Sequence, residues 1–265
     1  MTLFRPTSPM IDKLTTKAKP ATPSHQQYFT KEELKESPKF QFHLRSIVGD
    51  VNYTALSVRP DLTFATSYLS RYLEHSNKLT WRFAKQIQNY LRHTAQMKLH
   101  FSGNHTADSA GFHIFCDSDY ASVPITRDSC GGFIVMLNGN PIYWRSRKSS
   151  LICTSSTHAE LEAAFNAVEE VRWLFHGNDL LVTMKQPPLT TMYLHQDNQG
   201  CMSVFTAEFF DIKHWDVRYK YLQQMVRRKE ITLIYTPTAA MTADLLTKPL
   251  PSAAFERHRD TMHLR

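Results

Sequence analysis

Four acidic residues stand at the ends of predicted strands or helices, positions from which carboxylates of distant segments can meet. These residues are Asp117, Glu160, Asp197 and Asp244. Four carboxylates brought together repel one another unless cations lie between them, and such hard oxygen ligands suit Mg²⁺ or Mn²⁺. Two such ions about 4 Å apart activate a water molecule and stabilise the leaving oxygen in phosphodiester hydrolysis.

Each acid also has a purely structural explanation. Asp117 ends an apolar run, where Asp is a common turn former, and Glu160 completes a capping box with Thr157. Asp197 follows another apolar run and suits an Asx turn, whereas Asp244 lies in the first turn of a helical segment, where the macrodipole favours an acid. Taken singly, each acid is better explained as a cap or a turn; only their joint placement favours a metal site.

The elements that would position these acids form an α/β arrangement. Strands are expected at 111–117, 132–137, 141–147, 190–195 and 231–235, and helices at 157–179, 199–206, 215–228 and from 242 onward. Asn138-Gly139 is a strong hairpin signal between the second and third strands. This order predicts a mixed sheet flanked by helices. If the first and fourth strands are neighbours, the element ends that carry the four acids converge at one edge of the sheet.

The part of the chain before residue 104 has a different residue pattern. Residues 1–40 hold five prolines without hydrophobic periodicity, which predicts a mobile or surface-wrapped linker arm. Residues 41–103 show helical periodicity in three segments between 44 and 94, which predicts a small all-helical subdomain or appendage. The remaining residues, 104–265, would form the α/β domain.

Composition narrows the class of protein. The chain has 265 residues, is 42% hydrophobic and carries a formal net charge of +7, which suits either a polyanionic partner or a solvated basic face. Its four cysteines show no CxxC spacing, so we expect reduced thiols in a cytoplasmic or nuclear protein. No apolar run reaches the roughly 18 to 20 residues that span a bilayer, and no membrane partner or signal peptide is expected.

Many short motifs, in one order along residues 40–260, resemble the C-terminal RNase H region of Ty1/copia-type retrotransposon Pol polyproteins, with the reverse transcriptase connection helices that precede it. The motifs are Ser46-Ile47-Val48-Gly49, Arg59-Pro60-Asp61, Leu69-Ser70-Arg71, Asp117-Ser118-Asp119-Tyr120-Ala121, Gly132-Phe133, Trp144-Arg145-Ser146, Ser155-Ser156-Thr157, Ala159-Glu160, Asp197-Asn198-Gln199, Lys213-His214 and Ala243-Asp244-Leu245-Leu246-Thr247-Lys248-Pro249-Leu250. Each motif alone is weak, but so many in order are improbable by accident.

The resemblance implies an RNase H-like five-stranded mixed sheet and an endonuclease that cuts the RNA strand of an RNA–DNA hybrid. By position, the family's four metal-binding acids fall on Asp117, Glu160, Asp197 and Asp244, which would hold two Mg²⁺ ions, with Mn²⁺ as an alternative. Asp119 would have a turn or supporting role. Residues 41–103 would correspond to the thumb or connection of a reverse transcriptase, and the polymerase part of the parent polyprotein would be a second partner.

Basic residues stand where a hybrid would lie in this arrangement. They are Arg145, Arg147, Lys148, Lys213, His214 and Arg218. They would neutralise phosphates and make binding weaken with salt, although a solvated helix face explains part of the set equally well.

No Tyr-Val-Asp-Asp-like polymerase motif occurs, so no polymerase activity is expected from this chain alone. Two departures from the family pattern keep a second hypothesis open. His158 stands where relatives usually carry a second Glu, and a tolerated surface change explains it. Residues 235–241 contain no His near the last acid, a His that copia-like sequences commonly lack as well. The alternative to an active ribonuclease H is a catalytically silent or host-retained module of the same fold that binds nucleic acid or protein.

Overall fold

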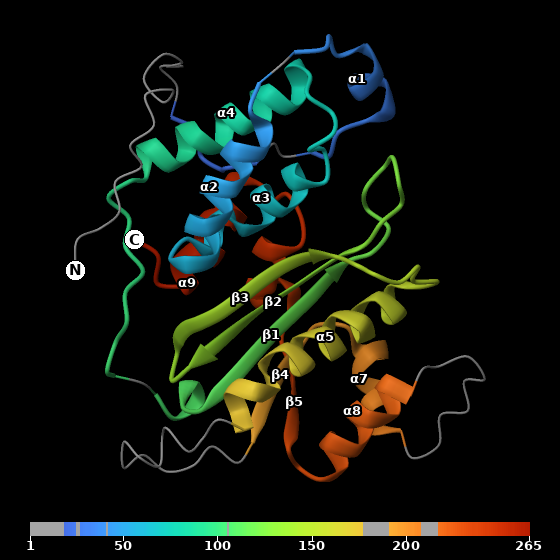
Figure 1. Cartoon of the computed structure of the whole chain (residues 1–265). Helices are drawn as coiled ribbons and strands as arrows, with labels where there is room; N and C mark the ends of the chain where they lie inside the picture. The colour runs from blue at the N-terminus through green and yellow to red at the C-terminus, as the bar shows by residue number, and fades with distance from the viewer. Residues whose placement is uncertain (1–18, 25–26, 41, 105, 177–190, 208–216) are drawn as a thin grey trace.

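The computed structural model describes residues 19–24, 27–40, 42–104, 106–176, 191–207 and 217–265, and its centre is a five-stranded sheet (Figure 1). The strand order is β3-β2-β1-β4-β5. The strands are β1 (Phe112–Asp119), β2 (Cys130–Leu137), β3 (Asn140–Lys148), β4 (Met192–Gln196) and β5 (Ile231–Tyr235). All five predicted strands are therefore present, and β1 continues two residues beyond Asp117.

The pairing of the strands is mixed, as the sequence predicts. β1, β2 and β3 form an antiparallel meander, whereas β4 pairs in parallel with both β1 and β5. Asn138 and Gly139 in the β2–β3 turn both have positive φ, 49° and 75°, as a two-residue hairpin of the I′ type requires. A three-stranded meander followed by two parallel strands on its β1 side is the RNase H-like arrangement, and the predicted fold class is confirmed.

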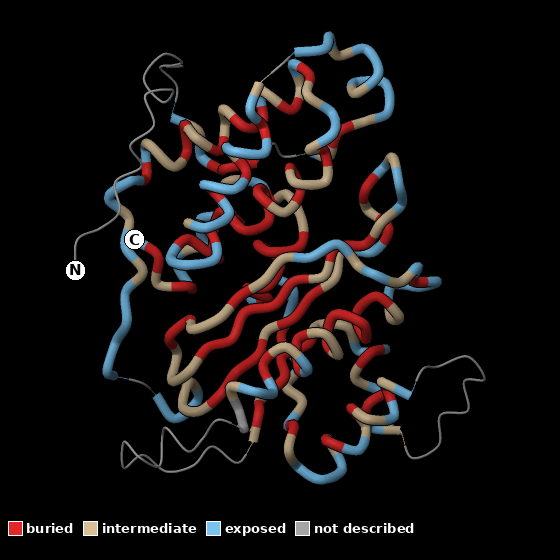
Figure 2. The backbone as a smooth tube through the Cα atoms, viewed as in Figure 1, coloured by how far each residue is buried: buried red, intermediate tan, exposed pale blue. Residues whose placement is uncertain are grey.

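Helices cover both faces of the sheet (Figure 1). One face packs against α5 (Ser156–His176), α7 (Gln199–Thr206) and α8 (Val217–Arg227); the other packs against the helices of the N-terminal half and α9 (Ser252–Thr261). Strand β2 shows the alternation this requires, because Phe133 and Val135 point to the first layer and Ile134 and Met136 to the second. Burial is accordingly concentrated in the central strands (Figure 2).

The N-terminal helices share a hydrophobic core with the sheet. They are α2 (Leu44–Ser57), α3 (Thr63–Ser70) and α4 (Lys78–His93), with the short 3₁₀ turn η1 (Pro60–Leu62) between the first two. Trp144 of β3 is buried and donates its indole N–H to the Ala55 carbonyl oxygen at 2.8 Å. The three predicted helices are therefore present, although the division of the chain at residue 103 stays a prediction.

Part of the proline-rich arm packs against these helices. It contains α1 (Lys31–Glu36), and Phe29 is buried against the rings of Tyr68, Tyr72 and Phe83. Between residues 27 and 40 the segment therefore lies on the protein, which agrees with the surface-wrapped form of the expectation. Residues 1–18 lie outside the described part of the chain.

The remaining short elements connect these layers. They are η2 (Ala107–Ser109), η3 (Thr238–Ala240) and η4 (Thr242–Leu246). Within the described residues, no helix combines the length and apolarity needed to cross a bilayer.

Two histidines form a buried polar chain between β1 and β4. His113 Nδ1 lies 2.9 Å from His195 Nε2, and His195 Nδ1 lies 2.8 Å from Thr236 Oγ1. Burial, and secondly the neighbouring His113, lowers the pKa of His195 to about 4. Between about pH 6.5 and pH 4, the imidazole of His195 is protonated in the unfolded chain but stays neutral in the folded protein. This group therefore lowers the free energy of unfolding as pH falls from about 6.5 towards 4.

We predict that His195→Gln reduces the acid sensitivity of the fold. Between pH 7.5 and pH 5, the free energy of unfolding should fall by about 2 kcal/mol more in the parent than in the variant, because only the parent must protonate this group on unfolding. Urea denaturation at the two pH values measures both changes. Equal falls in parent and variant would contradict the assignment.

Candidate active site

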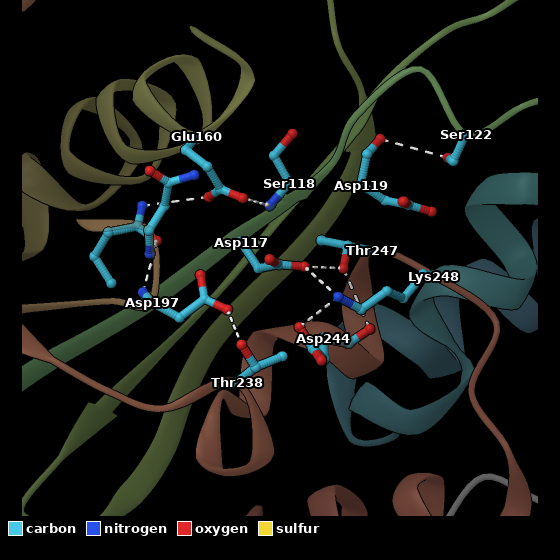
Figure 3. Close-up of polar contacts among 12 residues, drawn as sticks. Asp117, Ser118, Asp119, Ser122, Glu160, Asp197, Thr238, Asp244, Thr247 and Lys248 are labelled. Carbon is cyan, nitrogen blue, oxygen red and sulfur yellow. Dashed lines mark hydrogen bonds and ion pairs between the residues drawn. The ribbon is translucent and has the colours of Figure 1, made fainter. Parts of the chain in front are cut away.

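Three of the predicted acids meet at the edge of the sheet where β1 and β4 end (Figure 3). Asp117 lies near the end of β1, Asp197 directly follows β4, and Glu160 projects from the first turns of α5, which crosses the same edge. One carboxylate oxygen from each residue lies within 4.8 Å of the others. The parallel pairing of β1 with β4 creates this convergence, because parallel neighbours end on the same side.

The group is mostly buried. Asp117 is 3% exposed and Glu160 is 6% exposed, whereas Asp197 is half-buried. Burial, and then the negative charges of Asp117 and Asp197, raise the pKa of Glu160 well above its usual range. Two hydrogen bonds hold its carboxylate, from the Ser118 N–H at 3.3 Å and from the Gln196 side-chain amide at 3.3 Å.

Asp244 lies on the other side of Asp117 and is joined to it by a lysine (Figure 3). Lys248 Nζ is 2.9 Å from Asp244 Oδ1 and 3.5 Å from Asp117 Oδ2. Burial, and secondly Asp117, raises the pKa of Asp244 to about 7. For Lys248, the attraction of Asp117 and Asp244 outweighs desolvation, so its pKa is raised and the side chain stays cationic. The fourth acid therefore adjoins the site but is neutralised by an internal ammonium group.

The donor set fits a hard divalent cation. Three carboxylates within 4.8 Å of one another offer the oxygen ligands that Mg²⁺ and Mn²⁺ prefer. Among the described residues, Lys248 pairs with Asp117 and Asp244, and no basic side chain forms an ion pair with Glu160 or Asp197. Two like unit charges about 5 Å apart repel by about 3 kcal/mol at an effective dielectric constant of about 20. A cation between these three acids would remove that repulsion.

Two threonine hydroxyls hold the acids by hydrogen bonds. Thr247 donates its hydroxyl to Asp117 Oδ2, and Thr238 donates to Asp197 Oδ2 at 2.6 Å. Thr247 and Lys248 lie in the Leu-Leu-Thr-Lys motif quoted above, so the sequence carried a signal for them. Thr238 lies in η3, where no motif marked it.

The second acid of the β1 end, Asp119, takes no part in the three-acid group. Its carboxylate accepts a hydrogen bond from the Tyr28 hydroxyl of the N-terminal segment, and the Ser122 hydroxyl lies 3.1 Å from that of Tyr28. This matches the supporting or turn role expected for it.

The structure describes four of the six predicted nucleic-acid-binding residues. The side chain of each contacts another side chain of the same chain. Arg145 pairs with Glu170, and Arg147 Nη1 lies 3.7 Å from the same carboxylate. Lys148 Nζ is 2.7 Å from Asp128, and the Arg218 guanidinium stacks over the Phe165 ring at 5.4 Å. Lys213 and His214 lie outside the described residues.

A small cavity opens between β2, β3 and α5, next to the arginines. Its volume is about 40 Å³, and its lining includes Ser118, Arg145, Lys148 and Glu162. That volume is enough for a few water molecules.

Comparison with known proteins relates most of the chain to retrotransposon polyproteins. It is 29% identical over 233 residues to the Pol polyprotein of the Arabidopsis thaliana transposon RE2, covering 83% of this chain and 16% of that protein. It is 25% identical over 256 residues to the Saccharomyces cerevisiae Ty1-ER2 Gag-Pol polyprotein, covering 95% of this chain and 14% of that protein.

The homologues of this chain are Ty1/copia-type Pol polyproteins. The chain spans about one sixth or less of the length of these polyprotein relatives. A shorter relative is the secreted RxLR effector protein 161 of Plasmopara viticola, at 33% identity over 129 residues, or 49% of this chain and 89% of that protein. No family model matches the chain.

Solved structures show weaker likeness. The N-terminal RNase H domain of a Mycobacterium tuberculosis protein aligns with a TM-score of 0.38 and 14% identity over 57% of this chain and 98% of that one. A foamy viral protease-reverse transcriptase bound to double-stranded DNA aligns with a TM-score of 0.43 and 14% identity, covering 80% of this chain and 35% of that one. The fold assignment therefore rests on the strand order and pairing described above.

The Gly132-Phe133 motif has a steric basis in this structure. Gly132 pairs with Asp117 across the β1–β2 ladder, and a Cβ added to it would lie 2.8 Å from Leu246 Cβ and 2.9 Å from Thr247 Cγ2. The absence of a side chain lets η4 lie directly on β2, which brings Thr247 and Lys248 to Asp117.

His158, where the resemblance implies a second Glu, contributes to packing between α5 and α8. Its ring meets the Tyr219 ring edge-on at 5.9 Å, and the Thr154 backbone N–H lies 3.4 Å from His158 Nδ1. The side chain is half-buried between α5 and α8.

We predict that Gly132→Ala destabilises the protein by about 1–3 kcal/mol, the usual cost of overpacking, because η4 must shift. Gly131→Ala is the matched control, since its added Cβ would meet only Ala163, at an ordinary 3.6 Å from its Cβ and 3.8 Å from its Cα. The control should change the free energy of unfolding by less than about 1 kcal/mol. Urea denaturation of both variants in EDTA measures the difference, and equal effects would contradict the close approach of η4 to β2.

Proposed function

We propose that the chain is the RNase H part of a copia-type retrotransposon Pol polyprotein and hydrolyses the RNA strand of RNA–DNA hybrids in a divalent-metal-dependent reaction. The observation that carries the proposal is the meeting of Asp117, Glu160 and Asp197, from three separate elements, within 4.8 Å at one edge of an RNase H-like sheet. Caps and turns explain each acid singly, but they do not require these oxygens to meet.

Asp117, Glu160 and Asp197 would hold the metal, with Asp244 completing the set on the far side of Asp117. Two Mg²⁺ ions, or Mn²⁺ in their place, suit these oxygen donors. When bound, such ions lower the pKa of a water molecule and stabilise charge on the scissile phosphate.

The surrounding side chains hold the acids in place for this chemistry. Thr247 orients Asp117, Thr238 orients Asp197, and Ser118 N–H and Gln196 fix the two oxygens of Glu160. Lys248 supplies a positive charge beside Asp117 and Asp244, so fewer uncompensated negative charges face an incoming phosphate.

Binding of the hybrid would use the basic residues around this edge. Arg145, Arg147, Lys148 and Arg218 are the described candidates, and Lys213 and His214 complete the set. Phosphate contacts of this kind make binding fall with salt, and contacts to 2′-hydroxyls would select the RNA strand. The polymerase part of the polyprotein is the second proposed partner, in a cytoplasmic or nuclear setting.

A second candidate is a catalytically silent or host-retained module of the same fold. Lys248 favours it, because the ammonium group already compensates Asp117 and Asp244 without a metal ion. Such a site could outlast its catalytic function.

We predict that Asp117→Asn abolishes Mg²⁺-dependent cleavage of a labelled RNA–DNA hybrid, with a loss of at least about 100-fold, because it removes a shared carboxylate charge from the metal group. Asp119→Asn is the matched control. It makes the same substitution two residues away and keeps an oxygen for Tyr28, so it should retain most of the activity.

No cleavage by the parent chain with either Mg²⁺ or Mn²⁺ would reject the enzyme proposal for this chain and favour the silent module. Equal losses in the two variants would show instead that the end of β1 is needed for the fold rather than for metal binding.

A further inference from the structure

Gln196 is a fully buried polar residue at the end of β4, directly before Asp197. The residue is 0% exposed. A buried amide that lacks hydrogen-bond partners costs free energy, so the contacts of this side chain decide what it does.

The two ends of the Gln196 amide reach two different acid-bearing elements. Its nitrogen donates to Glu160 Oε2 of α5 at 3.3 Å. Its oxygen accepts from the backbone N–H groups of Asp197 at 2.9 Å and Asn198 at 3.3 Å. One side chain therefore links the carboxylate of Glu160 to the backbone that carries Asp197.

The neighbours of the amide fix which end is which. The Asp197 and Asn198 N–H groups are donors only, so the oxygen must face them, and the Glu160 carboxylate then receives the NH₂ group. The other close groups are the buried thiols of Cys201 and Cys116, at 3.6 Å and 4.0 Å from the nitrogen. A thiol sulfur is only a weak acceptor, so the Glu160 carboxylate is the stronger partner of the amide nitrogen.

Helix capping does not account for this arrangement. The N-terminus of α7 is capped by the Asn198 side chain, which accepts from the Cys201 N–H at 2.9 Å. The Gln196 amide is not part of that cap, and its N–H group donates to an acid of another element. A residue needed only to end the strand would not require that donor.

We infer that Gln196 is a positioning residue that sets the spacing of the Glu160 and Asp197 carboxylates and thereby the affinity of the site for a divalent cation. The inference rests on the proposed function, because it assigns Gln196 a role toward the metal that those acids would hold. The residue does not touch the metal and acts through Glu160 and the Asp197 backbone.

The test compares Gln196→Met with the parent by titrating Mn²⁺ into each protein in a calorimeter. Methionine keeps the length and most of the volume but has no amide, so Glu160 loses a donor and the Asp197 and Asn198 N–H groups lose their acceptor. Loss of such an outer contact typically lowers metal affinity by about 10–100-fold, and we expect at least about tenfold here.

Gln223→Met is the matched control. Gln223 also donates to an acceptor on another helix, the Val204 carbonyl oxygen at 2.6 Å, but it lies in α8 away from the acids. Its variant should bind Mn²⁺ with the affinity of the parent. Melting temperatures in EDTA, measured for all three proteins, separate a general loss of stability from a loss of metal affinity.

The outcomes distinguish the two proposals. If the parent binds no Mn²⁺ at the acids, the proposed function fails and this inference falls with it. If the parent binds and Gln196→Met binds equally well, the inference alone is overturned, even when the variant melts at a lower temperature. If Gln196→Met does not fold, Gln196→Asn replaces it, since the shorter amide cannot reach both elements, and the same tenfold loss is expected.

Discussion

The mutual repulsion of buried carboxylates is the constraint around which this edge of the molecule is built. Asp117 and Glu160 are almost fully buried, and Asp197 and Asp244 lie beside them. Charged groups leave water at a cost that only partners can offset. The fold supplies those partners from several elements, including the Lys248 ammonium, two threonine hydroxyls, the Ser118 N–H and the Gln196 amide. A divalent cation would relieve the repulsion that remains.

The pairing of the strands and the packing of α5 and η4 bring the acids and their partners to one edge of the sheet. Parallel pairing of β1 with β4 places two acids at one edge, and α5 brings the third across it. The bare backbone at Gly132 lets η4 approach β2, which delivers Thr247, Asp244 and Lys248. The N-terminal helices cover the opposite face of the sheet, so the central strands are buried on both sides.

How much of this was predictable depends on whether the signal is local. The strands and helices carry periodic apolar patterns and turn residues, so the sequence predicts them. The acids stand at the ends of these elements, so the sequence also predicts that they meet if the first and fourth strands are neighbours. The contacts of Gln196, Thr238 and Lys248 join residues that are distant in sequence, in another element, or both, and no local pattern records them. Phe29 shows the same limit, because one buried aromatic in a proline-rich segment makes no periodic signal.

The central claim is that the acids at the β1 and β4 ends form a divalent-metal site. Anomalous diffraction from crystals of the protein soaked in Mn²⁺ tests it most directly, because the signal locates the ion without any assay of activity. The account predicts an anomalous peak bounded by the carboxylates of Asp117, Glu160 and Asp197. Ordered acids with no peak between them at millimolar Mn²⁺, or Mn²⁺ bound only at other sites, would contradict it.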